Sequence, residues 1–122
     1  MGIDVRVFVK REDLKKLISN FDDLYFLWDF GMRRWWWFSE NFGVENKVGS
    51  KELIEKLAKL NRKISLREDI VRVCNEYDLI FQPDIEEKPK GFIDVYDLVS
   101  WLIKIGIENV DYYDFEEEGD EK

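Results

Sequence analysis

The densest run of large side chains in this chain, LWDFGMRRWWWFSE from Leu27 to Glu40, restricts the folds that the chain can adopt. Three consecutive tryptophans follow two arginines in this run. Successive side chains of a β-strand point to opposite faces of a sheet, so consecutive large apolar residues on a strand need cover on both faces. The run therefore predicts either a layered core or a surface that a partner covers.

A β-hairpin over residues 24–39 accounts for the order of the residues in this segment. Gly31 and Met32 suit a two-residue turn with glycine first, as a type II′ turn requires. In this register Asp29 faces Arg34 as an opposite-charge pair, and tryptophans lie on both faces. We therefore expect an α+β fold, with a mixed or antiparallel sheet centred on this aromatic hairpin and about four helices packed against it.

The rest of the chain carries periodic patterns that predict further strands and helices. Alternation of apolar and polar residues predicts a strand at the N-terminus, and apolar residues at helical spacing predict helices elsewhere. Ser50 is a suitable N-cap for one helix, and Asp94 for the last. The predicted strands cover residues 3–10, 78–82 and 91–95, and the predicted helical segments cover residues 11–21, 51–60, 65–77 and 94–106.

The length of 122 residues fits one domain. We expect a single α+β domain over residues 1–107 and an acidic aromatic tail over residues 108–122, with an edge strand followed by a disordered end. The N-terminus turns polar too early for a secretory signal, and no apolar run is long enough to span a membrane. We expect a cytoplasmic protein without membrane contact. Its Lys- and Glu-rich, Gln-poor composition is typical of heat-adapted proteins and also of proteins from AT-rich genomes.

The negative charge of the chain is concentrated at its C-terminal end. The net charge is −8, and residues 108–122 contain eight acidic residues and one lysine. Residues 1–107 keep 19 acidic and 18 basic residues and are nearly neutral. An acidic arm of this kind favours association with a basic protein surface, and its aromatic residues give it the character of a nucleic-acid mimic.

The residue types that usually carry catalysis are scarce. The chain has no histidine and one cysteine, Cys74, so histidine-based nucleophile pairs and cysteine metal cages are excluded. Cys74 falls on the apolar face of its predicted helix, where a buried thiol is common. We therefore expect no enzyme activity, no catalytic residue, no metal and no cofactor, and a carboxylate-metal hydrolase is a distant alternative.

These features together predict a non-catalytic binding protein: an inhibitor, an antitoxin-like protein or a host-interaction factor that engages a basic surface of another protein. Trp and Arg dominate the energetics of many protein interfaces, and so many aromatic residues also favour a homodimer. The predicted partner-binding residues are Arg33, Arg34, Trp35, Trp37, Tyr112, Tyr113, Asp114 and Phe115.

Residues 50–95 support an alternative hypothesis. Two helices across a short turn, followed by two strands joined by a charged loop, resemble the winged-helix arrangement of DNA-binding domains. The resemblance implies a nucleic-acid-binding or transcription-regulating protein. Its contacts to nucleic acid would be made by Arg67, Arg72, Lys88 and Lys90.

Overall fold

The computed structural model describes residues 5–43, 46–59, 67–83 and 87–105. Within these ranges the chain forms an α+β fold of six α-helices and one four-stranded antiparallel sheet. The strands are β1 (Val5–Lys10), β2 (Val48–Gly49), β3 (Leu79–Pro83) and β4 (Phe92–Asp94). The helices are α1 (Leu14–Ser19, after a 3₁₀ turn at Arg11–Asp13), α2 (Phe21–Arg33), α3 (Trp35–Phe42), α4 (Ser50–Lys59), α5 (Arg67–Glu76) and α6 (Val95–Ile105).

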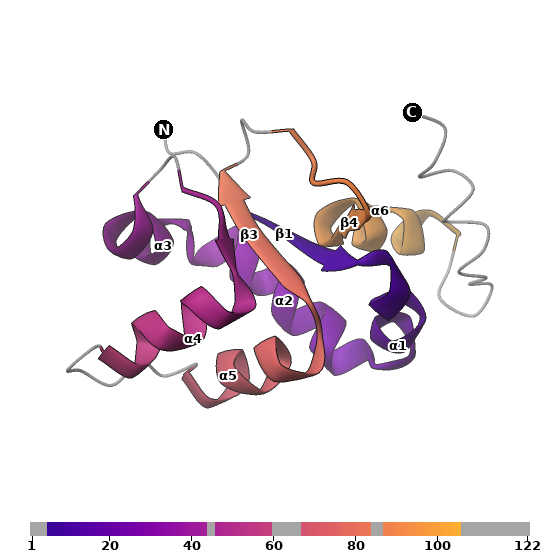
Figure 1. The fold of residues 1–122 in the computed structure, drawn as a ribbon. Helices are drawn as coiled ribbons and strands as arrows, with labels where there is room; N and C mark the ends of the chain where they lie inside the picture. Colours follow the sequence, from indigo (N-terminus) through magenta and orange to yellow (C-terminus); the bar gives the residue numbers. More distant parts are fainter. Residues whose placement is uncertain (1–4, 44–45, 60–66, 84–86, 106–122) are drawn as a thin grey trace.

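The predicted N-terminal strand is confirmed as β1, a central strand of the sheet. The strands lie in the order β2-β3-β1-β4, and every pair is antiparallel (Figure 1). Val7 pairs with Phe81, and Val9 pairs with both Leu79 and Ile93. Residues paired in this way project to the same face of a sheet. The alternation of β1 therefore builds one apolar face that continues across its neighbours.

Helix α2 packs on this apolar face, behind β1 and β3 in the view of Figure 1. A Cβ atom added to Gly31 would lie 3.0 Å from the carbonyl oxygen of Val5 and 3.4 Å from the side chain of Val7. Glycine thus allows the helix to approach the strand closely. Helices α4 and α6 contact the sheet as well, and the buried apolar residues of sheet and helices form one core cluster.

The predicted aromatic hairpin is wrong, because residues 24–39 are helical and Gly31 lies inside α2. Asn20 caps α2: its Oδ1 accepts the Asp23 backbone N–H at 3.3 Å. Buried residues then recur at Leu24, Leu27 and Phe30, which is a helical spacing. A helix turns successive side chains by about 100°, so it buries part of a dense aromatic run and exposes the rest.

The winged-helix order of elements is present, but the wing is not. The helices α4 and α5 and the strands β3 and β4 form close to the predicted positions. However, β3 and β4 do not pair with each other, because β1 lies between them. Both hydrogen-bonding edges of β1 are used, one by β3 and the other by β4. The predicted tail, residues 108–122, lies outside the described residues.

Candidate functional site

Helix α2 exposes a row of large side chains to solvent, which we call the α2 stripe: Phe21, Tyr25, Trp28 and Met32. Phe21, Tyr25 and Met32 are 57%, 55% and 44% exposed, and Trp28 is partly buried. At about 100° per residue, the four positions fall within a sector of about 60°. The rings of Tyr25 and Trp28 lie 5.8 Å apart between centroids. One side of α2 is therefore apolar but not covered by the described part of the chain.

Helix α3 divides the three tryptophans between core and surface. Trp37 is buried, and its ring packs edge-on against Phe30 at 6.1 Å and Phe42 at 6.2 Å. Trp35 and Trp36, which we call the tryptophan pair, are 36% and 49% exposed. The helix places residue 37 toward the core because neighbouring positions differ by about 100°. Two of the three tryptophans are thus exposed at the surface.

A pocket of about 150 Å³ opens between α2 and the beginning of α6. Cavities of this size hold a benzene ring or a comparable apolar group. The lining is mostly apolar and connects the α2 stripe to Tyr96, which is 41% exposed on α6. The lining residues are Val5, Arg6, Val7, Leu27, Trp28, Gly31, Met32, Val95 and Tyr96.

Beside this pocket, Arg6 and Asp94 form a long ion pair, with 3.5 Å between Nη1 and Oδ2. The Arg6 guanidinium also lies 4.9 Å from the centre of the Tyr96 ring. Asp94 caps α6, because its Oδ1 accepts the Tyr96 backbone N–H at 2.9 Å. Burial and the charge of Asp97 raise the pKa of Asp94 to about 6, against the opposing effect of Arg6. The charged groups of this corner are therefore engaged with one another.

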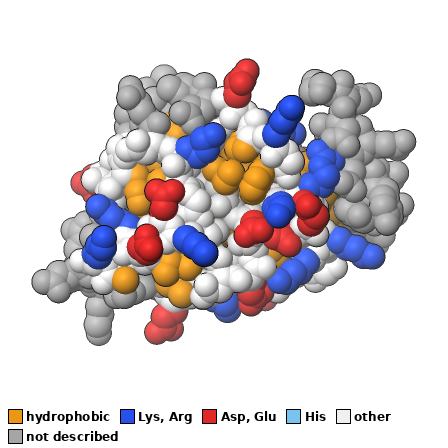
Figure 2. Space-filling model, viewed as in Figure 1, with side chains coloured by type: hydrophobic (Ala, Val, Ile, Leu, Met, Phe, Trp, Pro, Cys, Tyr) orange, Lys and Arg blue, Asp and Glu red, His pale blue; other side chains and the backbone are white. Residues whose placement is uncertain are grey.

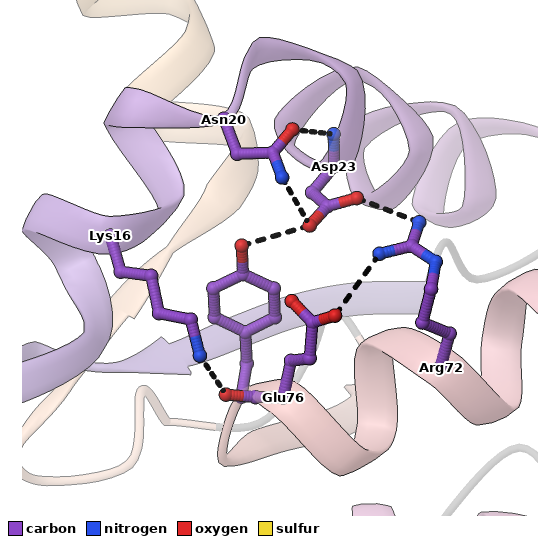
Figure 3. A network of polar contacts seen from close by, with 6 residues as sticks. Lys16, Asn20, Asp23, Arg72 and Glu76 are labelled. Carbon is purple, nitrogen blue, oxygen red and sulfur yellow. Dashed lines mark hydrogen bonds and ion pairs between the residues drawn. The ribbon is translucent and has the colours of Figure 1, made fainter.

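A second polar cluster is centred on the buried Asp23 of α2 and is drawn in Figure 3. The Asp23 carboxylate accepts hydrogen bonds from Arg72 Nη2 at 2.8 Å, the Tyr77 hydroxyl at 2.9 Å and Asn20 Nδ2 at 2.9 Å. Glu76 contacts the other Arg72 nitrogen at 3.5 Å. We call this cluster the Asp23 network. It joins α2 to the end of α5.

The Asp23 network has the chemistry of an ion pair that stabilises the packing of α2 against α5. Burial raises the pKa of Asp23, but the hydrogen bonds from Arg72 and Tyr77 outweigh it and hold that pKa below its ordinary value. The Lys16 ammonium lies over the Tyr77 ring at 4.8 Å and donates to the Glu76 carbonyl at 2.8 Å. This network was not predicted from the sequence, although Asn20 followed by Asp23 has the spacing of a capping box.

The predicted partner-binding residues lie in three different environments. Arg33 is exposed and pairs with Asp29 one turn earlier, with 2.6 Å between Nε and Oδ1, instead of the predicted Asp29–Arg34 pairing. Arg34, between α2 and α3, donates to the Arg33 carbonyl at 3.3 Å. Trp35 is at the surface, whereas Trp37 is in the core. The four predicted tail residues lie outside the described ranges.

The four basic residues of the nucleic-acid hypothesis lie in different parts of the fold. Arg72 belongs to the Asp23 network, and Lys88 and Lys90 are exposed after β3. Arg67 begins α5. On the molecular face that carries the outer side of the sheet, Figure 2 shows basic and acidic side chains intermixed. Among the coloured residues of that view, no continuous basic surface forms that would attract a phosphate backbone.

The described residues hold neither an activated thiol nor a metal-binding cluster. Burial raises the pKa of the Cys74 thiol to about 12, which keeps it protonated near neutral pH. No group of three histidine, cysteine or acidic side chains in the described ranges is arranged to hold a metal ion. No helix in those ranges is long and apolar enough to cross a membrane.

Comparison with models of protein families, with curated proteins and with solved structures finds no match for this chain.

Proposed function

We propose that this chain is a non-catalytic binding protein that docks on another protein through the tryptophan pair. The carrying observation is the exposure of Trp36, at 49%, beside Trp35, at 36%. Exposed tryptophans are costly to solvate and are enriched among the residues that dominate binding energy. Arg34, at the start of α3, adds a polar group of the kind found at interface edges.

The charge distribution supports a basic partner. The last 15 positions of the chain carry eight of its 27 acidic residues and a single lysine, whereas residues 1–107 are nearly neutral. A concentrated negative charge speeds encounter with a positive surface, and the effect weakens as salt screens it. The tryptophan pair would then supply the short-range contact, as in an inhibitor, an antitoxin-like protein or a host-interaction factor.

The proposal is tested by affinity capture from a lysate of the source organism, with and without nuclease. The variant Trp36→Ser should lose most of the captured protein, because the indole that fills the interface is gone. Ile103→Ser is the matched control: it removes an exposed apolar residue, 78% exposed, from α6, which lies at the opposite side of the molecule from α3 in Figure 1. Both variants should remain folded.

Two results would overturn the proposal. The first is capture that Trp36→Ser and Ile103→Ser reduce equally, since binding would then not depend on α3. The second is capture that nuclease treatment abolishes, which would favour a nucleic-acid partner. A truncation after Asn109 separates the contribution of the acidic tail, and its loss of capture should be greatest at low salt.

A further inference from the structure

The α2 stripe has a spacing that reads the same in both chain directions. Phe21, Tyr25, Trp28 and Met32 are separated by four, three and four residues. Their centre lies between residues 26 and 27. Alternating steps of four and three are the spacing with which one helix packs along another at a small crossing angle. The stripe therefore has the geometry of a helix–helix seam, although the described part of the chain provides no helix to cover it.

An antiparallel copy of α2 complements this seam. Around a two-fold axis through the centre, Phe21 of one copy lies opposite Met32 of the other, and Tyr25 lies opposite Trp28. Each of the four large residues then meets another large residue, and none meets a charge. A parallel copy would instead place each residue against its own equivalent and would have no such axis across α2.

The charges along α2 favour the same direction. Asp22, exposed in the first turn, and Arg33, exposed in the last turn, lie on the same flank of the stripe at opposite ends of the helix. An antiparallel copy brings Asp22 beside the turn that holds the Asp29–Arg33 ion pair, so that Arg33 lies between two carboxylates. The helix dipoles also oppose each other in this arrangement. In a parallel copy, the two-fold axis would run along the helices and place the two Asp22 residues on opposite flanks of the seam, so neither would approach Arg33 of the other copy.

We propose that a second copy of this chain covers the α2 stripe, with the two α2 helices antiparallel around a two-fold axis. Such an isologous contact is the commonest form of homodimer. Tyr96, which shares a pocket with Trp28 and Met32, lies beside the seam and would extend the contact onto α6. This dimer does not involve the tryptophan pair, so it stands or falls independently of the proposed function.

Sedimentation velocity of the full chain over a range of concentrations tests the dimer. The parent should show a monomer–dimer equilibrium, and Tyr25→Glu should weaken it at least about tenfold, because the charge would be buried at the centre of the seam. Met32→Glu provides a second lesion at the end of the seam, and Trp36→Ser is the matched control. A parent that remains monomeric, or a dimer weakened by Trp36→Ser but by neither α2 variant, would overturn the proposal.

A charge exchange tests the direction of the helices. Asp22→Arg and Arg33→Asp should each weaken the dimer, because each creates a like-charge contact across the axis. The double variant should recover most of the affinity, since it restores opposite charges. Circular dichroism confirms that each variant is folded. A double variant that dimerises no better than the single variants would refute the antiparallel pairing.

Engineered cysteines provide the decisive geometry. The substitutions Phe21→Cys and Met32→Cys place thiols at exposed positions, whereas the native Cys74 is buried. An equimolar mixture of the two variants should form the 21–32 disulfide under mild oxidation, and each variant alone should not. Disulfides formed within each variant alone would place the helices parallel and overturn the proposal.

Discussion

Two buried aspartates at the beginnings of two helices, Asp23 on α2 and Asp94 before α6, respond to burial in opposite ways. Asp23 is 1% exposed and accepts three side-chain hydrogen bonds. Asp94 is 8% exposed, accepts a backbone N–H, and faces a guanidinium only at 3.5 Å. The pKa of Asp23 is lowered and that of Asp94 is raised to about 6. Burial alone therefore does not decide the charge of a carboxyl group; its donors do.

The largest effect on stability is expected from removing Arg72, the cation of the Asp23 network. Arg72→Ala should lower the free energy of unfolding by about 3 kcal/mol at pH 7, because it leaves a buried carboxylate without its charged partner. Urea denaturation measures the loss. The control Lys59→Ala, at an exposed site on α4, should change stability by less than about 0.5 kcal/mol. Equal effects of the two variants would show that Asp23 does not depend on Arg72.

Asp94→Asn should change the free energy of unfolding in the opposite direction and stabilise the protein. Because the folded protein binds the Asp94 proton more tightly than the unfolded chain does, stability falls as the pH rises from about 4 to about 6, and the penalty is complete above pH 6. The variant should therefore be about 2–3 kcal/mol more stable than the parent above pH 6. Denaturation curves between pH 4 and 8 measure this difference, and parallel profiles for the two proteins would contradict it.

A smaller effect is expected from Tyr77→Phe. The substitution removes one donor from Asp23 and keeps the buried ring, so stability should fall by about 1 kcal/mol. The lost donor should also raise the pKa of Asp23. Carboxyl titration by NMR measures that pKa, and an unchanged value would mean that Arg72 and Asn20 alone set it.

The smallest effect is expected from Asp97→Asn. Asp97 is exposed, and its charge contributes to the raised pKa of Asp94. Neutralising it should lower the pKa of Asp94 and change stability by about 0.5 kcal/mol or less. The same NMR titration tests the direction, and a pKa of Asp94 that rises in the variant would exclude a repulsive role for Asp97.

The sequence was sufficient to predict those helices and strands whose residue pattern fits only one type of secondary structure. The alternation of β1, the Ser50 start of α4 and the Asp94 cap of α6 each pointed to one structure, and each formed. The pairing of the strands was not predictable, because the partners of β1 are remote in sequence and the local β3–β4 hairpin looked sufficient. Local pattern does not reveal which edge a distant strand will occupy.

The prediction for the aromatic segment, residues 24–39, was wrong for a different reason. A period of two and a period of 3.6 are hard to separate when nearly every residue is large and apolar. Gly31 suggested a turn, yet its role is close packing against Val5. The candidate site was therefore predicted in part: Trp35 is at the surface, Trp37 is not, and the exposed positions of α2 required the helix to be known.

The pairing of β1 also has a consequence for how the molecule is made. Each backbone pair between β1 and its two neighbours joins residues that are 70 to 86 positions apart in the chain. During translation, the first strand must therefore wait until most of the polypeptide has been synthesised before it finds either partner. Pairing between residues so distant in the chain slows folding. The aromatic helices α2 and α3 therefore remain without the sheet that covers them for much of the time that synthesis takes.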